Sequence, residues 1–253
     1  MKFKFSLPHK AKITGVILLA LLVVGVLFVG WAAQAAPAEP NALKRALEEP
    51  SVVVKNEKRY ITIAPKNSSP TTALIYYPGA KVAPEAYVAK LSAVARRANI
   101  SIVIGRPVLN LAIFSVNQAD TLKEALPGVT TWYIGGHSLG GAMACQYASS
   151  HSDQLEGLML FGSYCAADIS QTNLKVLLIS GANDGLTTVS KLEENQNNLP
   201  ASALLIAVPG MNHAQFGDYG TQEGDGVAAV ADEVAATAMA STVSNFLNEL
   251  KPE

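Results

Sequence analysis

The sequence predicts an α/β protein, in which a mostly parallel sheet is covered by helices on both faces and is preceded by an apolar N-terminal helix. Short apolar runs alternate with helical stretches in units of about 25–30 residues, which is typical of parallel strands joined by crossover helices. An uncharged block of 18 residues, Ile13–Gly30, precedes this alternation. The chain of 253 residues shows no internal repeat, so we expect one folded domain after the apolar block.

The composition excludes several classes of protein. Apolar residues make up 49% of the chain and charged residues 15%, the opposite of the balance that disorder requires. Residues 37–253 carry 15 Lys and Arg against 20 Asp and Glu without a basic run, so we expect no nucleic-acid partner. The two cysteines, Cys145 and Cys165, are too few for a disulfide framework or a thiolate zinc site, although they could pair with each other. No metal or cofactor is implied.

The N-terminal segment has the layout of a membrane-targeting sequence. Residues 1–12 carry four lysines and form a cytoplasmic n-region, and residues 13–31 form a signal anchor or a signal peptide. The length of the apolar block favours an uncleaved single-pass anchor in the cell membrane. Ala33-Gln34-Ala35 is a small-x-small cleavage signal, which favours secretion after cleavage near Ala35 instead. Both interpretations place the folded domain outside the cytoplasm.

The rest of the chain divides into a linker at residues 36–50, rich in Ala, Pro and Glu, and a domain at residues 51–253. Two short β-type runs indicate an edge hairpin, at Val52–Val54 and Tyr60–Ile63. Six apolar runs are typical of buried strands: Ala73–Tyr77, Ile100–Ile104, Trp132–Gly135, Leu155–Phe161, Val176–Ser180 and Leu204–Val208. Helical stretches are expected near Pro84–Ala98, Gln118–Leu126, Leu139–Ser149, Thr188–Asn198 and Val227–Leu250.

A glycine-rich turn between a predicted strand and a predicted helix carries the strongest chemical signal. Gly136-His137-Ser138-Leu139-Gly140-Gly141 follows the G-x-S-x-G pattern of a nucleophile elbow, in which glycines leave room for a strained turn. The turn would present the Ser138 hydroxyl at a helix N-terminus, which favours developing negative charge. A phosphate-binding loop would need a following Lys, and none is present. We therefore predict that Ser138 is a nucleophile.

A serine nucleophile needs a base, and the four histidines can be compared one by one. His9 precedes the apolar block, His137 lies in the elbow and is expected to point away from the serine, and His151 ends the elbow helix roughly 20 Å away. His213 directly follows the predicted strand Leu204–Val208, where a base is expected. We predict His213 as the base.

The acid of such a triad is expected after an intervening strand, between nucleophile and base in the sequence. Asp184 occupies this position in Asn183-Asp184-Gly185, and Asp168 in the preceding loop is the reserve candidate. Asp153 is expected to be solvated near a helix end, and turn chemistry accounts for Asp218 and Asp225. Asp184 would hold the imidazole in one tautomer and stabilise its cation.

An oxyanion hole needs two backbone N–H groups. One is expected from Leu139, the residue after the nucleophile, and the other from the loop after an earlier strand. Pro78-Gly79-Ala80 follows the strand Ala73–Tyr77, so Ala80 is the predicted second donor, although Pro-Gly would equally form an ordinary type II turn.

The chain resembles the serine α/β-hydrolases over about residues 50–250, and it is most similar to small bacterial members near the dienelactone hydrolases. The resemblance is carried by Tyr77-Pro78-Gly79-Ala80, Gly136-His137-Ser138-Leu139-Gly140-Gly141, Asn183-Asp184-Gly185 and Asn212-His213-Ala214-Gln215-Phe216-Gly217. It implies an α/β-hydrolase fold with about eight strands, a triad of Ser138, Asp184 and His213, and oxyanion donors Ala80 and Leu139. Dienelactone hydrolases use cysteine where this chain has Ser138, so their substrate is not transferred.

Two segments bear on the shape of the substrate site. The stretch between Phe161 and Val176, where many relatives insert a helical cap, is too short for a cap domain, so we expect an open site. The apolar segment Arg106–Phe114 either lines an acyl pocket or packs in the core, and the same two roles are open to Met211 and Phe216.

The sequence thus predicts an extracytoplasmic serine hydrolase that cleaves carboxylic esters or a related small-molecule acyl substrate through an acyl-enzyme. An acyltransferase using the same triad is an alternative, since an alcohol can replace water. A non-catalytic ligand-binding or envelope module with the same fold is a second alternative, because fold alone does not imply activity.

Overall fold

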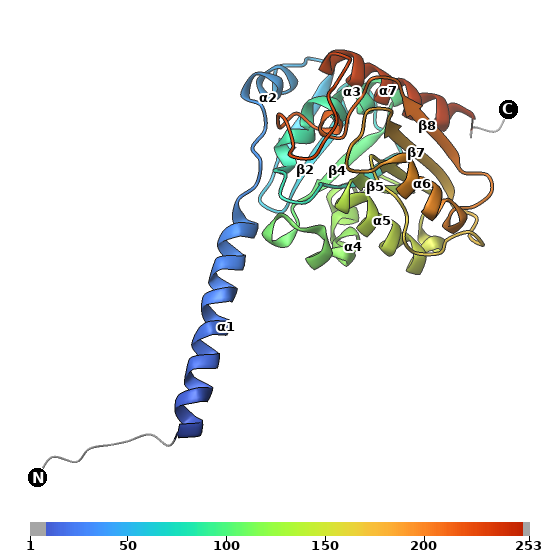
Figure 1. Ribbon diagram of the computed structural model, residues 1–253. Helices are drawn as coiled ribbons and strands as arrows, with labels where there is room; N and C mark the ends of the chain where they lie inside the picture. Colours follow the sequence, from blue (N-terminus) through green and yellow to red (C-terminus); the bar gives the residue numbers. More distant parts are fainter. Residues whose placement is uncertain (1–8, 250–253) are drawn as a thin grey trace, which may run out of the picture.

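The computed structural model describes residues 9–249 and has a long N-terminal helix, α1 (His9–Ala33), that projects from an α/β domain (Figure 1). Residues 1–8 of the expected n-region, and Leu250 of the expected last helix, lie outside the described residues. The helix α1 is long and apolar enough over Ile13–Ala33 to span a membrane or to act as a signal peptide.

The domain is built on a sheet of eight strands: β1 (Val52–Asn56), β2 (Tyr60–Pro65), β3 (Thr72–Tyr77), β4 (Ser101–Gly105), β5 (Thr131–His137), β6 (Gly157–Phe161), β7 (Lys175–Gly181) and β8 (Leu204–Val208). Their order in the sheet is β1-β2-β4-β3-β5-β6-β7-β8. The first two strands pair antiparallel, β2 also pairs antiparallel with β4, and all other pairs are parallel. The predicted fold class is therefore confirmed.

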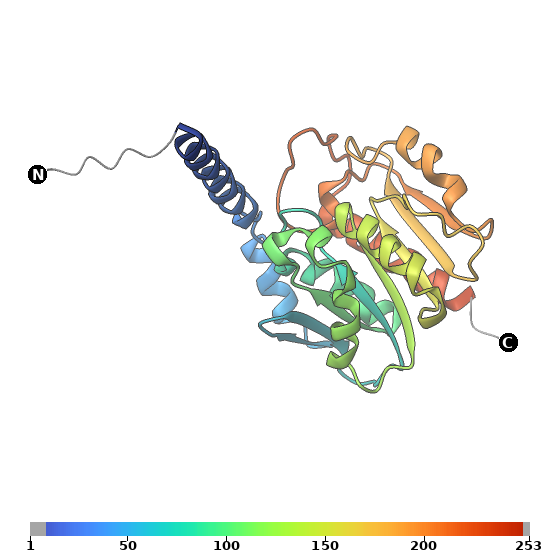
Figure 2. The same cartoon turned by 90° about the horizontal axis from the view of Figure 1, so that it is seen from below.

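Helices cover both faces of this sheet, as Figures 1 and 2 show. They are α2 (Pro40–Leu47), α3 (Val88–Ala98), α4 (Ala119–Leu122), α5 (Leu139–Ser150), α6 (Val189–Asn195) and α7 (Asp232–Glu249). Alternate residues of β3 enter the two cores: Leu74 and Tyr76 pack with α3 and α7, and Ile75 and Tyr77 pack with α4 and α5. This period of two follows from the alternation of side chains along a strand.

The last helix starts later than its hydrophobic pattern predicts. Residues 227–230 form a loop held by a hydrogen bond from Ala229 N–H to the Gly210 carbonyl, and Val227 is 85% exposed. The apolar stripe therefore belongs to the helix only from Asp232, because the preceding residues bond to the loop after β8 instead of continuing the helical ladder. Residues 162–174, between β6 and β7, contain no helix or strand, so no cap domain is inserted there.

Candidate active site

Ser138 lies at a sharp turn between β5 and α5. Its backbone has φ 52° and ψ −126°, a conformation that is costly for a residue with a side chain and that clusters at functional sites. The flanking glycines allow the turn because a Cβ atom at Gly136 or Gly140 would collide with the carbonyl oxygen of Tyr77. The local sequence therefore produces the strained elbow that its glycine spacing predicts.

The loops after β7 and β8 bring a carboxylate and an imidazole together. Asp184 Oδ2 lies 2.8 Å from His213 Nδ1, and both side chains are buried. Asp184 Oδ1 accepts hydrogen bonds from the backbone N–H groups of Leu186 (2.8 Å) and Thr187 (2.6 Å), which stabilise an ionised carboxylate. An ionised Asp184 only accepts, so Nδ1 of His213 carries the proton in this pair.

The second ring nitrogen of His213 is the chemically available one. Its Nε2 atom is buried and has no hydrogen-bond partner among residues 9–249. With Nδ1 protonated, Nε2 carries the free lone pair and can accept a proton. The carboxylate therefore holds the His213 ring in one tautomer, and no hydrogen bond within residues 9–249 joins its Nε2 to Ser138.

The alternative acids and bases lie elsewhere. Asp168 is exposed and accepts a hydrogen bond from Ser170 N–H in its own loop. His151 caps the far end of α5, where its Nδ1 lies 3.0 Å from the Tyr147 carbonyl and its ring stacks on Tyr147. Neither residue contacts the Asp184–His213 pair.

His137 lies closer to the pair than expected from the sequence. Its ring centroid is 4.4 Å from that of His213, and its Nδ1 lies 3.0 Å from the hydroxyl of Tyr87. Burial lowers the pKa of His137 well below its usual value, and the neighbouring His213 acts in the same direction. His137 is therefore a neutral ring that packs against His213.

Tyr87 connects His137 to the predicted oxyanion loop. Its hydroxyl accepts a hydrogen bond from Gly79 N–H at 2.9 Å, and burial raises the pKa of the phenol, which keeps it neutral. Tyr87 stands in η1 (Pro84–Tyr87), just before α3, and the sequence pattern shows it only as one residue of a helical stretch. The only feature of the sequence that could have indicated this role is a tyrosine shortly after the Pro78-Gly79 turn.

The two predicted oxyanion donors lie at the ends of neighbouring elements. Ala80 is exposed two residues beyond Pro78, and Leu139 is the half-buried first residue of α5. No hydrogen bond within residues 9–249 uses the N–H group of Ala80. Because β3 and β5 are adjacent and parallel, both donors stand at the same edge of the sheet.

Asp225 ties the acid loop to the histidine loop, a role that turn chemistry does not anticipate. Its Oδ1 accepts from the N–H groups of Gly185 and His213, both at 3.1 Å, and its Oδ2 accepts from Ala214 N–H at 2.8 Å. The Asp225 carboxylate therefore joins the backbone beside Asp184 to the backbone at His213. The sequence gives no signal for this long-range contact.

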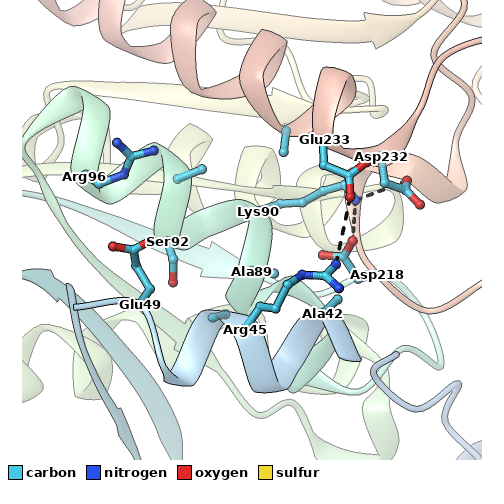
Figure 3. Close-up of a pocket in the computed structure, with 13 residues that line it drawn as sticks. Ala42, Arg45, Glu49, Ala89, Lys90, Ser92, Arg96, Asp218, Asp232 and Glu233 are labelled. Carbon is cyan, nitrogen blue, oxygen red and sulfur yellow. Dashed lines mark hydrogen bonds and ion pairs between the residues drawn. The ribbon is translucent and has the colours of Figure 1, made fainter. Parts of the chain in front are cut away.

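A buried ion pair anchors the other side of the histidine loop. Lys90 on α3 is only 1% exposed, and its Nζ lies 2.5 Å from Asp218 and 3.4 Å from Asp232. These residues border a cavity of about 200 Å³ that α2 covers with Arg45 and Glu49 (Figure 3). Removal of Asp218 from water raises its pKa, although Lys90 opposes this shift. The pair therefore fixes the loop between His213 and Tyr219 to α3.

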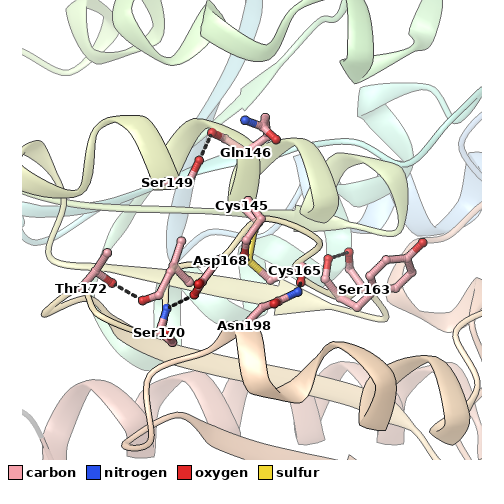
Figure 4. Close-up of a disulfide and its surroundings, with 12 residues drawn as sticks. Cys145, Gln146, Ser149, Ser163, Cys165, Asp168, Ser170, Thr172 and Asn198 are labelled. Carbon is pink, nitrogen blue, oxygen red and sulfur yellow. Dashed lines mark hydrogen bonds between the residues drawn. A yellow bond between two sulfur atoms is a disulfide. The ribbon is translucent and has the colours of Figure 1, made fainter.

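A disulfide joins the elbow helix to the loop after β6. Cys145 on α5 pairs with Cys165, with 5.4 Å between their Cα atoms (Figure 4). In the same loop, the Ser163 hydroxyl donates to the Ser138 carbonyl at 2.7 Å. The loop after β6 thus contacts both the turn at Ser138 and the helix that follows it.

The remaining sequence candidates pack in the core or lie on the surface. Met211 and Phe216 are fully buried in the core between the sheet and α7. In Arg106–Phe114, Leu111 and Ala112 are buried, whereas Val108, Ile113 and Phe114 are exposed. Among the described residues, no group of three or more His, Cys, Asp or Glu side chains is arranged to hold a metal ion.

Comparison with known proteins identifies the family. The model of the alpha/beta hydrolase family matches residues 73–237, which is more than half of the chain. The chain therefore belongs to the alpha/beta hydrolase family, as its motifs predict, and is a hydrolase by this membership. No curated protein matches the sequence.

Solved structures, two carboxyl esterases among them, share the fold at low sequence identity. EstE1, a thermophilic carboxylesterase from a metagenomic library, has a TM-score of 0.60 at 14% identity, covering 85% of this chain and 95% of its own. Carboxyl esterase 2 from the mycorrhizal fungus Tuber melanosporum has a TM-score of 0.59 at 11% identity, covering 84% of this chain and 91% of its own. Est1E from Butyrivibrio proteoclasticus has a TM-score of 0.55 at 13% identity, covering 79% and 98%. The resemblance to the dienelactone-hydrolase group stays a prediction.

Proposed function

We propose that the protein is a serine esterase that cleaves carboxylic esters with Ser138, His213 and Asp184 as its triad. The single observation that carries this proposal is the buried Asp184–His213 pair, in which the His213 Nε2 atom has no hydrogen-bond partner in the described chain and is free to accept a proton. The strained turn at Ser138 supports it, since such strain persists only where the surrounding structure maintains it. The esterases among the structural neighbours are consistent with this chemistry.

In this mechanism the Ser138 oxygen attacks the ester carbonyl while His213 Nε2 takes the hydroxyl proton. The negative charge on the carbonyl oxygen would be stabilised by the N–H groups of Ala80 and Leu139. His213 then gives its proton to the departing alcohol, which leaves an acyl group on Ser138. Water attacks this ester with His213 again taking a proton, and the released acid restores Ser138. Asp184 stabilises the imidazolium in both halves without being protonated itself.

We further propose that α1 anchors the enzyme in the cell membrane with residues 37–253 outside the cytoplasm. The segment Ile13–Ala33 has 21 residues and a mean hydropathy of 2.9, and its length is close to the thickness of the hydrocarbon core. The Cys145–Cys165 disulfide supports this location, because disulfides persist in oxidising compartments outside the cytoplasm.

A fluorophosphonate adduct tests the triad directly, because this reagent needs an activated serine. The full chain in detergent should gain the mass of a single adduct, and Ser138→Ala should gain none. Addition of an alcohol acceptor to the ester assay, with product analysis, separates hydrolysis from acyl transfer. A folded protein without an adduct would favour the non-catalytic binding module and would contradict the proposed enzyme.

A further inference from the structure

Three exposed apolar side chains gather on one loop of the domain. Val108, Ile113 and Phe114 are 59%, 54% and 52% exposed, and they belong to η2 (Val108–Asn110) and η3 (Ala112–Phe114). We refer to these three residues as the η2–η3 patch. The other large apolar side chains exposed on the described domain are dispersed along the chain, five on different helices or strands and Val227 in a loop: Leu47, Val53, Val189, Leu205, Val227 and Val234. Exposed apolar patches mark interaction surfaces, whereas single exposed side chains are ordinary.

The patch lies beside the end of α1, as Figures 1 and 2 both show. The ring of Phe114 meets that of Phe28 edge-on, with 6.3 Å between centroids. Phe28 lies five residues before the end of α1 at Ala33, about 7.5 Å along the helix axis at 1.5 Å per residue. A span of 21 residues is about 31 Å long and leaves little excess over a core of about 30 Å. If α1 crosses the membrane, Phe114 therefore lies at the depth of the lipid and not of the water.

The residues around this contact are those expected at a membrane interface. Trp31 is an amphipathic ring of the kind that is enriched at this depth, and Lys81 Nζ lies 4.1 Å from its ring centroid. A lysine here would also be attracted to anionic headgroups. Val108, Ile113 and Phe114 stay exposed on this loop, while Leu111 and Ala112 are buried. Leu109 and Asn110 both adopt left-handed backbone conformations, with φ 55°. The contact of Phe114 with Phe28 of α1 selects a lipid surface as the partner of the patch.

Short contacts join the patch to the proposed oxyanion loop. Lys81, the residue after Ala80, donates its N–H to the Asn110 carbonyl at 2.8 Å, and its own carbonyl accepts from Ala36 N–H at 2.7 Å. On the other side, η3 packs against α5, the helix that begins directly after Ser138. The loop that carries the patch therefore touches both elements that the mechanism uses around the substrate carbonyl.

We propose that the η2–η3 patch inserts into the outer face of the membrane that α1 spans, and that the active site takes long-chain acyl esters from that lipid layer. This inference rests on the proposed esterase and deepens it by naming the substrate class. An ester whose acyl chain stays in the bilayer would reach Ser138 at the membrane surface without passing through water. No cap covers the site between β6 and β7 to hinder this entry.

The depth of the patch can be measured without any assay of activity. Because Cys145 and Cys165 are paired, a third cysteine can be labelled alone with a fluorescent dye. The full-length Ile113→Cys variant, reconstituted in vesicles of phosphatidylcholine and phosphatidylglycerol, should show a blue-shifted dye that spin-labelled lipids quench severalfold. Val189→Cys on α6 is the matched control and should not be quenched. Equal, weak quenching at both positions would overturn the inference, as would loss of α1 from the mature protein.

Substrate preference provides the second measurement. The variant Val108→Ser/Ile113→Ser/Phe114→Ser should cleave 4-nitrophenyl palmitate in these vesicles at least tenfold more slowly than the unsubstituted protein. Its rate with soluble 4-nitrophenyl butyrate should stay within twofold of that of the unsubstituted protein. The control Val53→Ser/Val189→Ser/Leu205→Ser should lose neither activity. Equal losses in both variants would overturn the substrate class. If the unsubstituted chain cleaves neither ester, the proposed esterase fails, whereas the quenching result still decides whether the patch lies in lipid.

Discussion

Two buried histidines meet at the carboxyl edge of the sheet, and they have different partners. His213, after β8, bonds to the Asp184 carboxylate, whereas His137, at the end of β5, bonds to the neutral hydroxyl of Tyr87. Their ring centroids are only 4.4 Å apart, and both rings are almost fully buried. Burial therefore does not distinguish them, but the charge of the partner does.

This difference supports His213, and not His137, as the proposed base. A carboxylate stabilises the imidazolium that forms when a histidine takes a proton, and a neutral phenol provides no such stabilisation. Burial lowers the pKa of His137, so this ring resists protonation. His137 is adjacent to Ser138 in the sequence, but within residues 9–249 it has no carboxylate partner. The Asp184 carboxylate therefore favours His213 as the proposed base.

The largest effect on kcat is expected when the two histidines are replaced one at a time. Loss of the proposed base in His213→Ala should reduce kcat for a soluble ester by about five to six orders of magnitude, because proton transfer would be lost. His137→Gln should reduce kcat by less than about tenfold if its ring only packs and positions. Steady-state kinetics on both folded variants would measure the difference. A comparable loss in the two would contradict the division of tasks.

A smaller effect is expected at the phenol that holds His137. Tyr87→Phe leaves Gly79 N–H and His137 Nδ1 without their shared partner, which should lower the free energy of unfolding by about 2 kcal/mol. Because Gly79 precedes the predicted oxyanion donor, we expect kcat to fall by about tenfold with little change in KM. Urea denaturation and steady-state kinetics check the two parts.

Tyr219→Phe is the matched control for this variant. The Tyr219 hydroxyl bonds to the side chain of Gln222 in an exposed loop. The free energy of unfolding and kcat of Tyr219→Phe should therefore stay near those of the unsubstituted protein. An equal loss of kcat in the two variants would show that Tyr87 has no special relation to the oxyanion loop.

The smallest effect concerns the pH dependence of stability. Burial holds the pKa of His137 in the folded state below its ordinary value of 6.5, so the unfolded chain binds more protons just below this pH. Stability from this residue is fully present above pH 6.5 and is lost as the pH falls, by up to about 1.4 kcal/mol per pH unit. Chemical denaturation between pH 4 and 7 should show a shallower slope in His137→Gln. An unchanged slope would mean that His137 is protonated in the folded state.

Much of the fold follows from local sequence patterns. Strand–helix alternation predicts the sheet and its two helical layers, and the short segment after Phe161 predicts the missing cap. The turn at Ser138 is equally local, since Gly136 and Gly140 permit it within a few residues. The start of the last helix is the main error, because a hydrogen bond to Gly210, far away in the sequence, holds residues before Asp232 in a loop.

Local sequence patterns are enough to predict the order of the elements, the strained serine turn, and the loops in which Asp184 and His213 follow their strands. The hydrogen bond between Tyr87 and His137, the link that Asp225 makes between the loops of Asp184 and His213, and the Cys145–Cys165 disulfide are visible only in the folded chain. The tertiary structure also placed the segment Arg106–Phe114 beside α1. The physical reason is that backbone conformation depends on near neighbours, whereas these contacts join residues that become neighbours only when the parallel strands are ordered in the sheet.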